Sequence, residues 1–254
     1  VDDITTADHW YERSMPSPVT QPLFDAAREL GVGFCLGYAE LTDDGHRFNT
    51  QILVEKDGSV VAKYRKVHIP GHEHHEPDRP FQHAERYYFE PSMEGFGVWK
   101  AFGGRIGMMI CNDRRWPETY RVMGLQGVEL VMLGYNTPST NQAAAGFEAH
   151  HLRVFHSHLS IQAGAYQNGT WAVGVAKAGL EEGVDQIGQS CIIAPSGEIV
   201  TQCTTLGDEL QVARCDLDLC NSYKTSIFNF ARHRRPEHYG LIAAPDPGGP
   251  GSRR

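Results

Sequence analysis

A cysteine lies where a predicted strand passes into a predicted helix, and this position suits a nucleophile. The strand pattern over residues 105–110 ends at Cys111, and Pro117 opens the next helical pattern. A side chain there is exposed beside a helix N-terminus, where the helix dipole and nearby cations favour the reactive thiolate. The alternative is a buried structural cysteine, although residues 112–115, Asn-Asp-Arg-Arg, are polar surroundings for an inert thiol. Spacing alone leaves both interpretations open.

A lysine at the end of another predicted strand is the second candidate. Lys66 closes the stretch Lys-Tyr-Arg-Lys over residues 63–66 and leads into an aperiodic segment that extends to about residue 95. An ammonium at a strand end can stabilise negative charge on a reacting oxygen, and a loop of this length in a compact domain is often functional. The alternative is a solvated basic turn, which Lys66 taken alone would favour.

Histidines gather in two places, but neither pattern predicts a metal centre. Residues 72–76 read His-Glu-His-His-Glu, which departs from the zinc-binding H-E-x-x-H pattern because a Glu stands where the second His should be. The histidines within 150–158 do not share one helical face at the spacing a zinc site needs. The sequence also lacks the G-x-S-x-G, P-loop and G-x-G-x-x-G motifs, so it does not indicate a serine hydrolase, NTPase or dinucleotide enzyme.

The elements that must position these residues are strands mixed with helices. Strands are predicted at 33–39, 48–54, 59–64, 97–102, 105–110, 129–133, 171–176, 189–194, 198–202 and 210–215, and helices at 23–30, 117–125, 147–167 and 216–227. Tight turns join some strands and helical crossovers join others, which predicts an α/β layered domain with a mixed sheet. The Gly- and Pro-rich residues 244–254 are expected to form a disordered tail after a domain over residues 1–243.

Composition narrows the possible partners and the compartment. The net charge of -8 over 254 residues disfavours a nucleic-acid partner. No apolar run approaches a membrane span, and the acidic, polar start is no signal peptide. We therefore predict a cytoplasmic protein with no membrane partner, in which five of the six cysteines are reduced, buried, apolar side chains.

Three segments together resemble the nitrilase superfamily of carbon-nitrogen hydrolases: residues 63–68, 107–113 and 134–138. The Cys-Asn-Asp-Arg-Arg-Trp-Pro-Glu sequence of 111–118 and the Arg-Pro-Phe-Gln-His sequence of 79–83 are similar to the N-carbamoyl-D-amino-acid amidohydrolases. The resemblance covers almost the whole chain except the tail. It implies an α-β-β-α sandwich with mixed sheets, a mechanism that needs no metal or organic cofactor, and a homodimer or homotetramer.

The resemblance also implies roles for individual residues. Cys111 would be the nucleophile, Lys66 would hold the tetrahedral oxyanion, and Glu85 would help to position Lys66 and the substrate. Arg114 and Arg115 would meet the substrate carboxylate, because a guanidinium fork suits that planar anion. The remaining pocket residues would be His68, His83, Asn112, Asn136 and Thr137.

The activity implied is hydrolysis of the carbamoyl C–N bond of N-carbamoyl-D-amino acids to the D-amino acid, carbon dioxide and ammonia. Another branch of the superfamily, such as an amidase, a nitrilase or a β-ureidopropionase, stays open. The family's general base is a Glu at the end of an early strand, and neither Glu12 nor Glu40 has the matching context. We therefore expect that Glu and the first strand-helix-strand unit to be absent, so a catalytically impaired fragment that only binds ligand also stays open.

Overall fold

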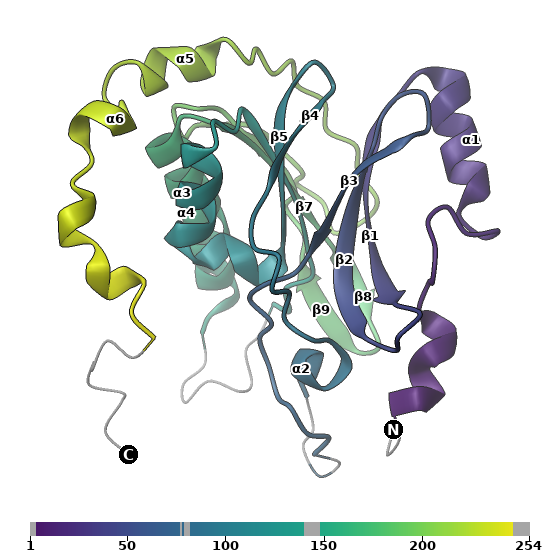
Figure 1. The fold of residues 1–254 in the computed structure, drawn as a ribbon. Helices are drawn as coiled ribbons and strands as arrows, with labels where there is room; N and C mark the ends of the chain where they lie inside the picture. Colours follow the sequence, from purple (N-terminus) through teal and green to yellow (C-terminus); the bar gives the residue numbers. More distant parts are fainter. Residues whose placement is uncertain (1–3, 77, 79–81, 140–147, 246–254) are drawn as a thin grey trace.

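A computed structural model describes residues 4–76, 78, 82–139 and 148–245, and its strands form two main sheets (Figure 1). The smaller sheet is antiparallel, in the order β1 (Phe34–Leu41), β2 (Arg47–Val54) and β3 (Val60–Arg65). The larger sheet runs β11 (Ile199–Gln202), β10 (Cys191–Ile193), β7 (Trp171–Ala176), β6 (Leu130–Tyr135), β5 (Gly104–Ile110) and β4 (Val98–Ala101). It is a mixed sheet, because β5, β6 and β7 are parallel to one another and β4 and β10 pair antiparallel to this group.

Helices cover the outer face of each sheet, which gives four layers. In Figure 1, α1 (Gln21–Leu30) lies outside the smaller sheet, and α3 (Pro117–Leu125) and α4 (His150–Asn168) lie outside the larger one. The short helices are α2 (Glu85–Tyr88), α5 (Leu219–Lys224), α6 (Phe230–His233) and 3₁₀ turns at Ile4–Trp10, Cys111–Arg115, Pro236–His238 and Gly240–Ile242. The α-β-β-α sandwich with mixed sheets is confirmed, whereas the expected lack of a first strand-helix-strand unit concerns the chain before Val1 and stays a prediction.

The period of two along the strands separates three hydrophobic layers. On β5, Ile106, Met108 and Ile110 point between the sheets, where they pack with Leu53, Ala62 and Tyr64. The intervening Met109 points to the other side and packs with Tyr120, Met123 and Ile161 of α3 and α4. Phe24 of α1 packs on Ile52 and Val54, on the outer face of the smaller sheet. Strand β5 is therefore buried on both faces, and its carboxyl end is held in place by the two cores.

In the chain's second half one predicted strand is wrong and one hairpin was not predicted. The strand predicted at 210–215 is no strand, and Leu210 and Val212 are 85% and 80% exposed, because no described strand pairs with that segment. The hairpin of β8 (Ala178–Glu181) and β9 (Val184–Ile187) was not predicted. Its two turn residues, Glu182 and Gly183, both have positive φ, but Glu-Gly is a weaker turn signal than Asn-Gly or Asp-Gly.

The other expectations about the chain have mixed outcomes. The helix predicted at 147–167 begins at His150 among the described residues, and the helix predicted at 216–227 shrinks to α5. All six cysteines are free, with Cys191, Cys203 and Cys220 buried and Cys35, Cys111 and Cys215 partly exposed. No described helix is both long and apolar enough to cross a membrane. Most of the predicted disordered tail, residues 246–254, lies outside the described residues.

Candidate active site

Cys111 lies on a tight elbow at the carboxyl end of β5. Its φ of 47° is in the left-handed region, which costs a non-glycine residue on the order of 1–3 kcal/mol and persists only where the surroundings impose it. Strands β5 and β6 are parallel, so their carboxyl ends meet at one edge of the sheet. The Cys111 thiol accordingly lies 3.7 Å from the backbone oxygen of Asn136, the residue that follows β6. The cysteine is thus a half-buried thiol at a strand end, as the sequence predicts for a nucleophile.

Arg114 supports this elbow from beneath. Its side chain is buried, and its Nη1 donates to the Cys111 backbone oxygen at 2.6 Å and lies 3.9 Å from the Cys111 sulfur. Its Nη2 donates to the Thr137 hydroxyl at 3.0 Å, and the guanidinium carbon lies 4.1 Å from the centre of the Tyr135 ring. Arg114 therefore places a positive charge beside the sulfur, while two of its nitrogen atoms are already occupied by protein oxygens.

Arg115 is the more exposed guanidinium of the pair. Its Nη1 donates to the Asn112 side-chain oxygen at 3.1 Å. Desolvation lowers the pKa of Arg115, and the nearby cations Arg114 and Arg153 lower it further. Arg153 of α4 is itself held by the Pro138 backbone oxygen at 2.6 Å and by Glu148 at 2.9 Å. Glu148 neutralises Arg153, so the positive charge close to the thiol comes from Arg114 and Arg115.

The buried Lys66 and the partly exposed Glu85 form an ion pair just beyond β3. The Lys66 side chain is fully buried and its Nζ donates to the Glu85 carboxylate, which also accepts from Asn49 Nδ2 at 2.9 Å. His83 Nε2 lies 3.5 Å from the other Glu85 oxygen. Burial alone would raise the pKa of Glu85, but its hydrogen bonds and the Lys66 ammonium outweigh that effect and lower it. Glu85 is therefore held as a carboxylate and keeps Lys66 oriented.

Gly71 explains how the long loop brings Glu85 back to Lys66. The His72 backbone N–H donates to the His83 oxygen at 2.7 Å, so the two arms of the loop lie against each other. A β-carbon on Gly71 would stand 2.0 Å from that oxygen, and the φ of Gly71 is +92°. Only glycine fits this crossing without strain, and the crossing fixes where α2 and Glu85 begin.

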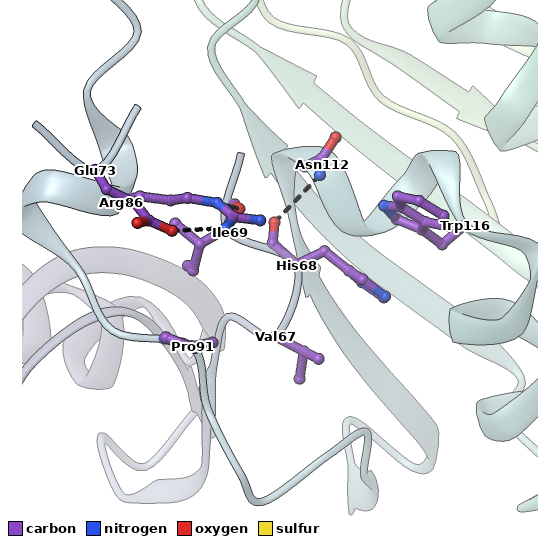
Figure 2. Close-up of a pocket in the computed structure, with 8 residues that line it drawn as sticks. All are labelled: Val67, His68, Ile69, Glu73, Arg86, Pro91, Asn112 and Trp116. Atoms are coloured by element: carbon purple, nitrogen blue, oxygen red, sulfur yellow. Dashed lines mark hydrogen bonds and ion pairs between the residues drawn. The ribbon is translucent and has the colours of Figure 1, made fainter. Parts of the chain in front are cut away.

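His68 and Asn112 connect the two halves of the site. Figure 2 shows the Asn112 side chain pointing to the His68 backbone oxygen, to which it donates at 3.3 Å. Both residues line a cavity of about 290 Å³ together with Val67, Ile69, Glu73, Arg86, Pro91 and Trp116. Cys111, Lys66 and Glu85 are not part of its lining. The cavity therefore adjoins the candidate reaction centre without containing it.

The structure groups the predicted site residues through direct contacts. Cys111, Arg114, Asn136 and Thr137 form one group, Lys66, Glu85 and His83 a second, and His68, Asn112 and Arg115 a third. Sequence reasoning missed the supporting roles of Asn49 and Arg153. It also missed Asp113, a buried carboxylate that contacts Tyr64, His68 and Ile110, although its place within the polar stretch after Cys111 was a usable signal.

Glu40 lies outside this site, in agreement with its sequence context. Its carboxylate is on the outer face of the smaller sheet, where Lys63, Arg65 and Thr50 donate to it at 2.7–2.8 Å. Desolvation raises the pKa of Glu40, but these donors win and lower it to about 2. Such a carboxylate is a weak proton acceptor. Among the described residues, no cluster of three or more His, Cys, Asp or Glu side chains could hold a metal ion.

Comparisons with known proteins identify the family of this chain. The family model described as carbon-nitrogen hydrolase matches residues 3–225. An N-carbamoylputrescine amidase of Arabidopsis thaliana is 31% identical over 247 residues, which are 94% of this chain and 79% of that protein.

Solved structures show the same fold. A carbon-nitrogen hydrolase from Helicobacter pylori G27 has a TM-score of 0.80 at 22% identity, over 96% of this chain and 81% of that one. A mutant of the amidase from Nesterenkonia sp. AN1 has a TM-score of 0.56 at 22% identity, over 72% of this chain and 60% of that one. Its structure shows covalent addition of the acetamide moiety of fluoroacetamide at the active-site cysteine.

Proposed function

This chain belongs to the carbon-nitrogen hydrolase family of the nitrilase superfamily, and we propose that it hydrolyses the carbamoyl C–N bond of N-carbamoyl-D-amino acids. The observation that supports this substrate class is the positive charge around the thiol. Arg114 Nη1 lies 3.9 Å from the Cys111 sulfur, and Arg115 adds a second guanidinium at the exposed rim. Such a rim attracts a substrate carboxylate and repels a substrate ammonium.

The names of the relatives favour a substrate with the same carbamoyl group but with an amine in place of the amino acid. N-carbamoylputrescine, the substrate in the name of the Arabidopsis relative, is an N-carbamoyl amine that carries an ammonium at its far end. An N-carbamoyl amino acid carries a carboxylate next to the scissile nitrogen instead. The two candidates share the carbamoyl group and differ in the sign of one charge. We propose that the carboxylate binds the exposed guanidinium of Arg115. The buried Arg114 guanidinium, which holds the Cys111 backbone oxygen, adds electrostatic attraction.

The proposed reaction begins with the thiolate of Cys111 attacking the carbamoyl carbon. The carbonyl oxygen becomes an oxyanion, which the Lys66 ammonium stabilises, and a donor of this kind is worth ~3–4 kcal/mol in comparable sites. The C–N bond then breaks, and the amino acid leaves after its nitrogen takes a proton. Water hydrolyses the carbamoyl thioester, which restores the thiol and releases carbon dioxide and ammonia. All of these steps use side chains and water. The scheme is that of a complete enzyme, in which the resemblance assigns the thiol proton to a further glutamate whose sequence context neither Glu12 nor Glu40 matches.

A substrate panel tests this function. N-carbamoyl-D-phenylalanine, its L-enantiomer, N-carbamoylputrescine and butyramide are supplied in turn, and ammonia release is measured. We expect turnover of the D-carbamoyl amino acid, and we expect its loss in Cys111→Ala. Turnover in Cys111→Ala would end the covalent mechanism. Preference for N-carbamoylputrescine would show that the substrates are N-carbamoyl amines instead. Preference for butyramide would show that the chain is an amidase for simple amides.

The expected homodimer or homotetramer also remains a proposal. Its support in the structure is the outer face of α4, where Leu152, Phe155, Leu159 and Tyr166 are 38–55% exposed. These side chains recur at three-, four- and seven-residue intervals, which is the pattern of a helix that packs against another element. Sedimentation equilibrium of the wild-type chain and of Phe155→Glu measures this directly. A monomeric wild type would exclude the assembly.

A further inference from the structure

We propose that the buried Asp113 carboxylate is a positioning group that holds the Lys66 ammonium and the Cys111 thiol in register across the two sheets. The inference rests on the proposed function in one respect, because it takes Lys66 and Cys111 as the groups that act on one carbonyl. Asp113 is fully buried, so it contacts protein groups and acts through them.

Four donors from two segments converge on this carboxylate. One oxygen accepts from the His68 backbone N–H at 3.1 Å and from His68 Nδ1 at 2.9 Å. The other accepts from the Tyr64 hydroxyl at 2.7 Å and from the Ile110 backbone N–H at 2.9 Å. A carboxylate has room for about four such donors, so Asp113 has no acceptor position left for a substrate or a proton-transfer step.

The positions of these donors along the chain give the carboxylate its effect. Tyr64 and His68 flank Lys66 by two residues on each side, at the end of β3. Ile110 and Asp113 itself flank Cys111, at the end of β5. One side chain therefore ties the backbone around the ammonium to the backbone around the thiol. Hydrogen bonds to an ionised acceptor are roughly twice as strong as neutral ones, so this connection is stiff.

The elbow at Cys111 needs such a connection. Its left-handed backbone is strained and persists only when neighbouring contacts impose it. Asp113 holds the Ile110 N–H on one side of Cys111, and Arg114 holds the Cys111 oxygen on the other. The His68 ring is in turn stacked between Phe96 and Trp116, at centroid distances of 5.6 and 5.2 Å. The imidazole that donates to Asp113 is thus packed against two aromatic rings.

The test is Asp113→Asn. An amide keeps the shape but replaces one acceptor oxygen with a donor, so in either orientation two of the four donors lose their partner. We expect kcat to fall about 100-fold with KM little changed, since a displacement of ~1 Å between reacting groups costs about that factor. We also expect faster hydrogen exchange at the backbone amides of both His68 and Ile110. Alkylation of Cys111 by iodoacetamide, which needs the thiol alone, should change much less than kcat.

Glu40→Gln is the matched control. Glu40 is also a buried carboxylate with four donors, and it lies on the outer face of the smaller sheet. We expect it to leave kcat and the exchange of His68 and Ile110 unchanged at a temperature where the protein is folded. A loss of kcat in Asp113→Asn that only matches its unfolded fraction, measured by circular dichroism, would overturn the positioning role. So would an unchanged kcat in a folded Asp113→Asn.

Two further readouts keep the outcome decisive. If Asp113→Asn does not fold, Tyr64→Phe removes one donor and leaves the carboxylate; a lowered kcat at an unchanged melting temperature supports the inference, and an unchanged kcat refutes it. If the wild type turns over no compound of the panel, the proposed function fails, and the exchange data still decide. Faster exchange at both His68 and Ile110 supports the connection between the two segments, whereas a change at one segment alone contradicts it.

Discussion

Strand β3 and its immediate continuation carry two cation–carboxylate clusters on opposite faces of the smaller sheet. The outer cluster is Glu40 with Lys63, Arg65 and Thr50, and the inner cluster is Glu85 with Lys66, Asn49 and His83. Each contains a glutamate with little exposure, a lysine from the same stretch of chain and a polar side chain from β2. The alternation of side chains along a strand is enough to send Lys63 to one face and Lys66 to the other.

The difference between the two clusters lies in how fully each carboxylate is occupied. The two Glu40 oxygens accept four hydrogen bonds at 2.7–2.8 Å, two of them from the Arg65 fork. The two Glu85 oxygens are less evenly supplied, because Lys66 and Asn49 share one of them and His83 stands 3.5 Å from the other. A saturated cluster can contribute only to stability. An incompletely saturated cluster beside a cavity can accept a group from a ligand.

The largest expected effect separates the two lysines. Lys66→Met should lower kcat/KM by roughly 10²–10³-fold, since it removes the charge that faces the developing oxyanion. Lys63→Met should leave kcat/KM within about 2-fold, because Lys63 is partly exposed and Arg65 still neutralises Glu40. Steady-state kinetics on the substrate found in the panel measures both. Similar losses in the two variants would abolish the distinction between the faces.

Exchanging each glutamate for glutamine should separate stability from activity. Glu40→Gln should lower the free energy of unfolding by about 3 kcal/mol, because Lys63 and Arg65 lose their buried partner, and kcat should not change. Glu85→Gln should lower kcat by at least ~10-fold, because the amide no longer holds the Lys66 ammonium as a charge partner. Urea unfolding and kinetics on both variants provide the data. A Glu40→Gln enzyme that unfolds normally but has lost turnover would contradict the assignment.

These two clusters also show where sequence reasoning succeeds and where it stops. The alternation of side chains and the residues that stop it placed Lys66 and Cys111 at strand ends, which the structure has. The pattern alone left the role of Cys111 open and favoured a basic turn for Lys66, so their catalytic roles came from the resemblance. Glu85 was identified through the resemblance alone, since nothing local shows that an aperiodic loop returns to Lys66. That return depends on Gly71 allowing the His83 oxygen to approach, which is a contact between residues twelve positions apart.

The same limit explains the errors in the fold. Helix α3 and strand β7 have the predicted bounds, because Pro117 and the residues around β7 signal their ends locally. Residues 210–215 have the alternating pattern of a strand, but a strand also needs a neighbouring strand to pair with. The order of strands in a sheet cannot be predicted from a local pattern, and no described strand pairs with these residues. Asp113 was overlooked for a related reason, since its four donors come from segments up to 49 positions away.

Acid unfolding should distinguish the clusters with a smaller effect. The pKa of Glu40 is lowered from 4.5 to about 2 in the folded chain, so its stabilising contribution is complete above the unfolded pKa and is lost as pH falls towards 2. The loss is on the order of 3 kcal/mol, because each pKa unit corresponds to about 1.4 kcal/mol. Urea midpoints between pH 5 and pH 2.5 should therefore fall less steeply for Glu40→Gln than for the wild type. Parallel curves for the two proteins would show that Glu40 does not cause the loss of stability in acid.

The smallest effect compares two neighbouring residues of β2 that donate to the two glutamates. Asn49 Nδ2 donates to Glu85 at 2.9 Å, and the Thr50 hydroxyl donates to Glu40 at 2.7 Å. A hydrogen bond to a charged group contributes ~1.5 kcal/mol, about a factor of 10 in an equilibrium or a rate. Thr50→Val should therefore cost about 1.5 kcal/mol of stability without lowering kcat, and Asn49→Ala should lower kcat about 10-fold with a smaller loss of stability. The two hydrogen bonds are chemically alike and their donors are adjacent in sequence. A loss of stability in Thr50→Val and a loss of kcat in Asn49→Ala would therefore show that one of two neighbouring residues supports the fold and the other supports the site. Equal effects on kcat in both variants would contradict this distinction.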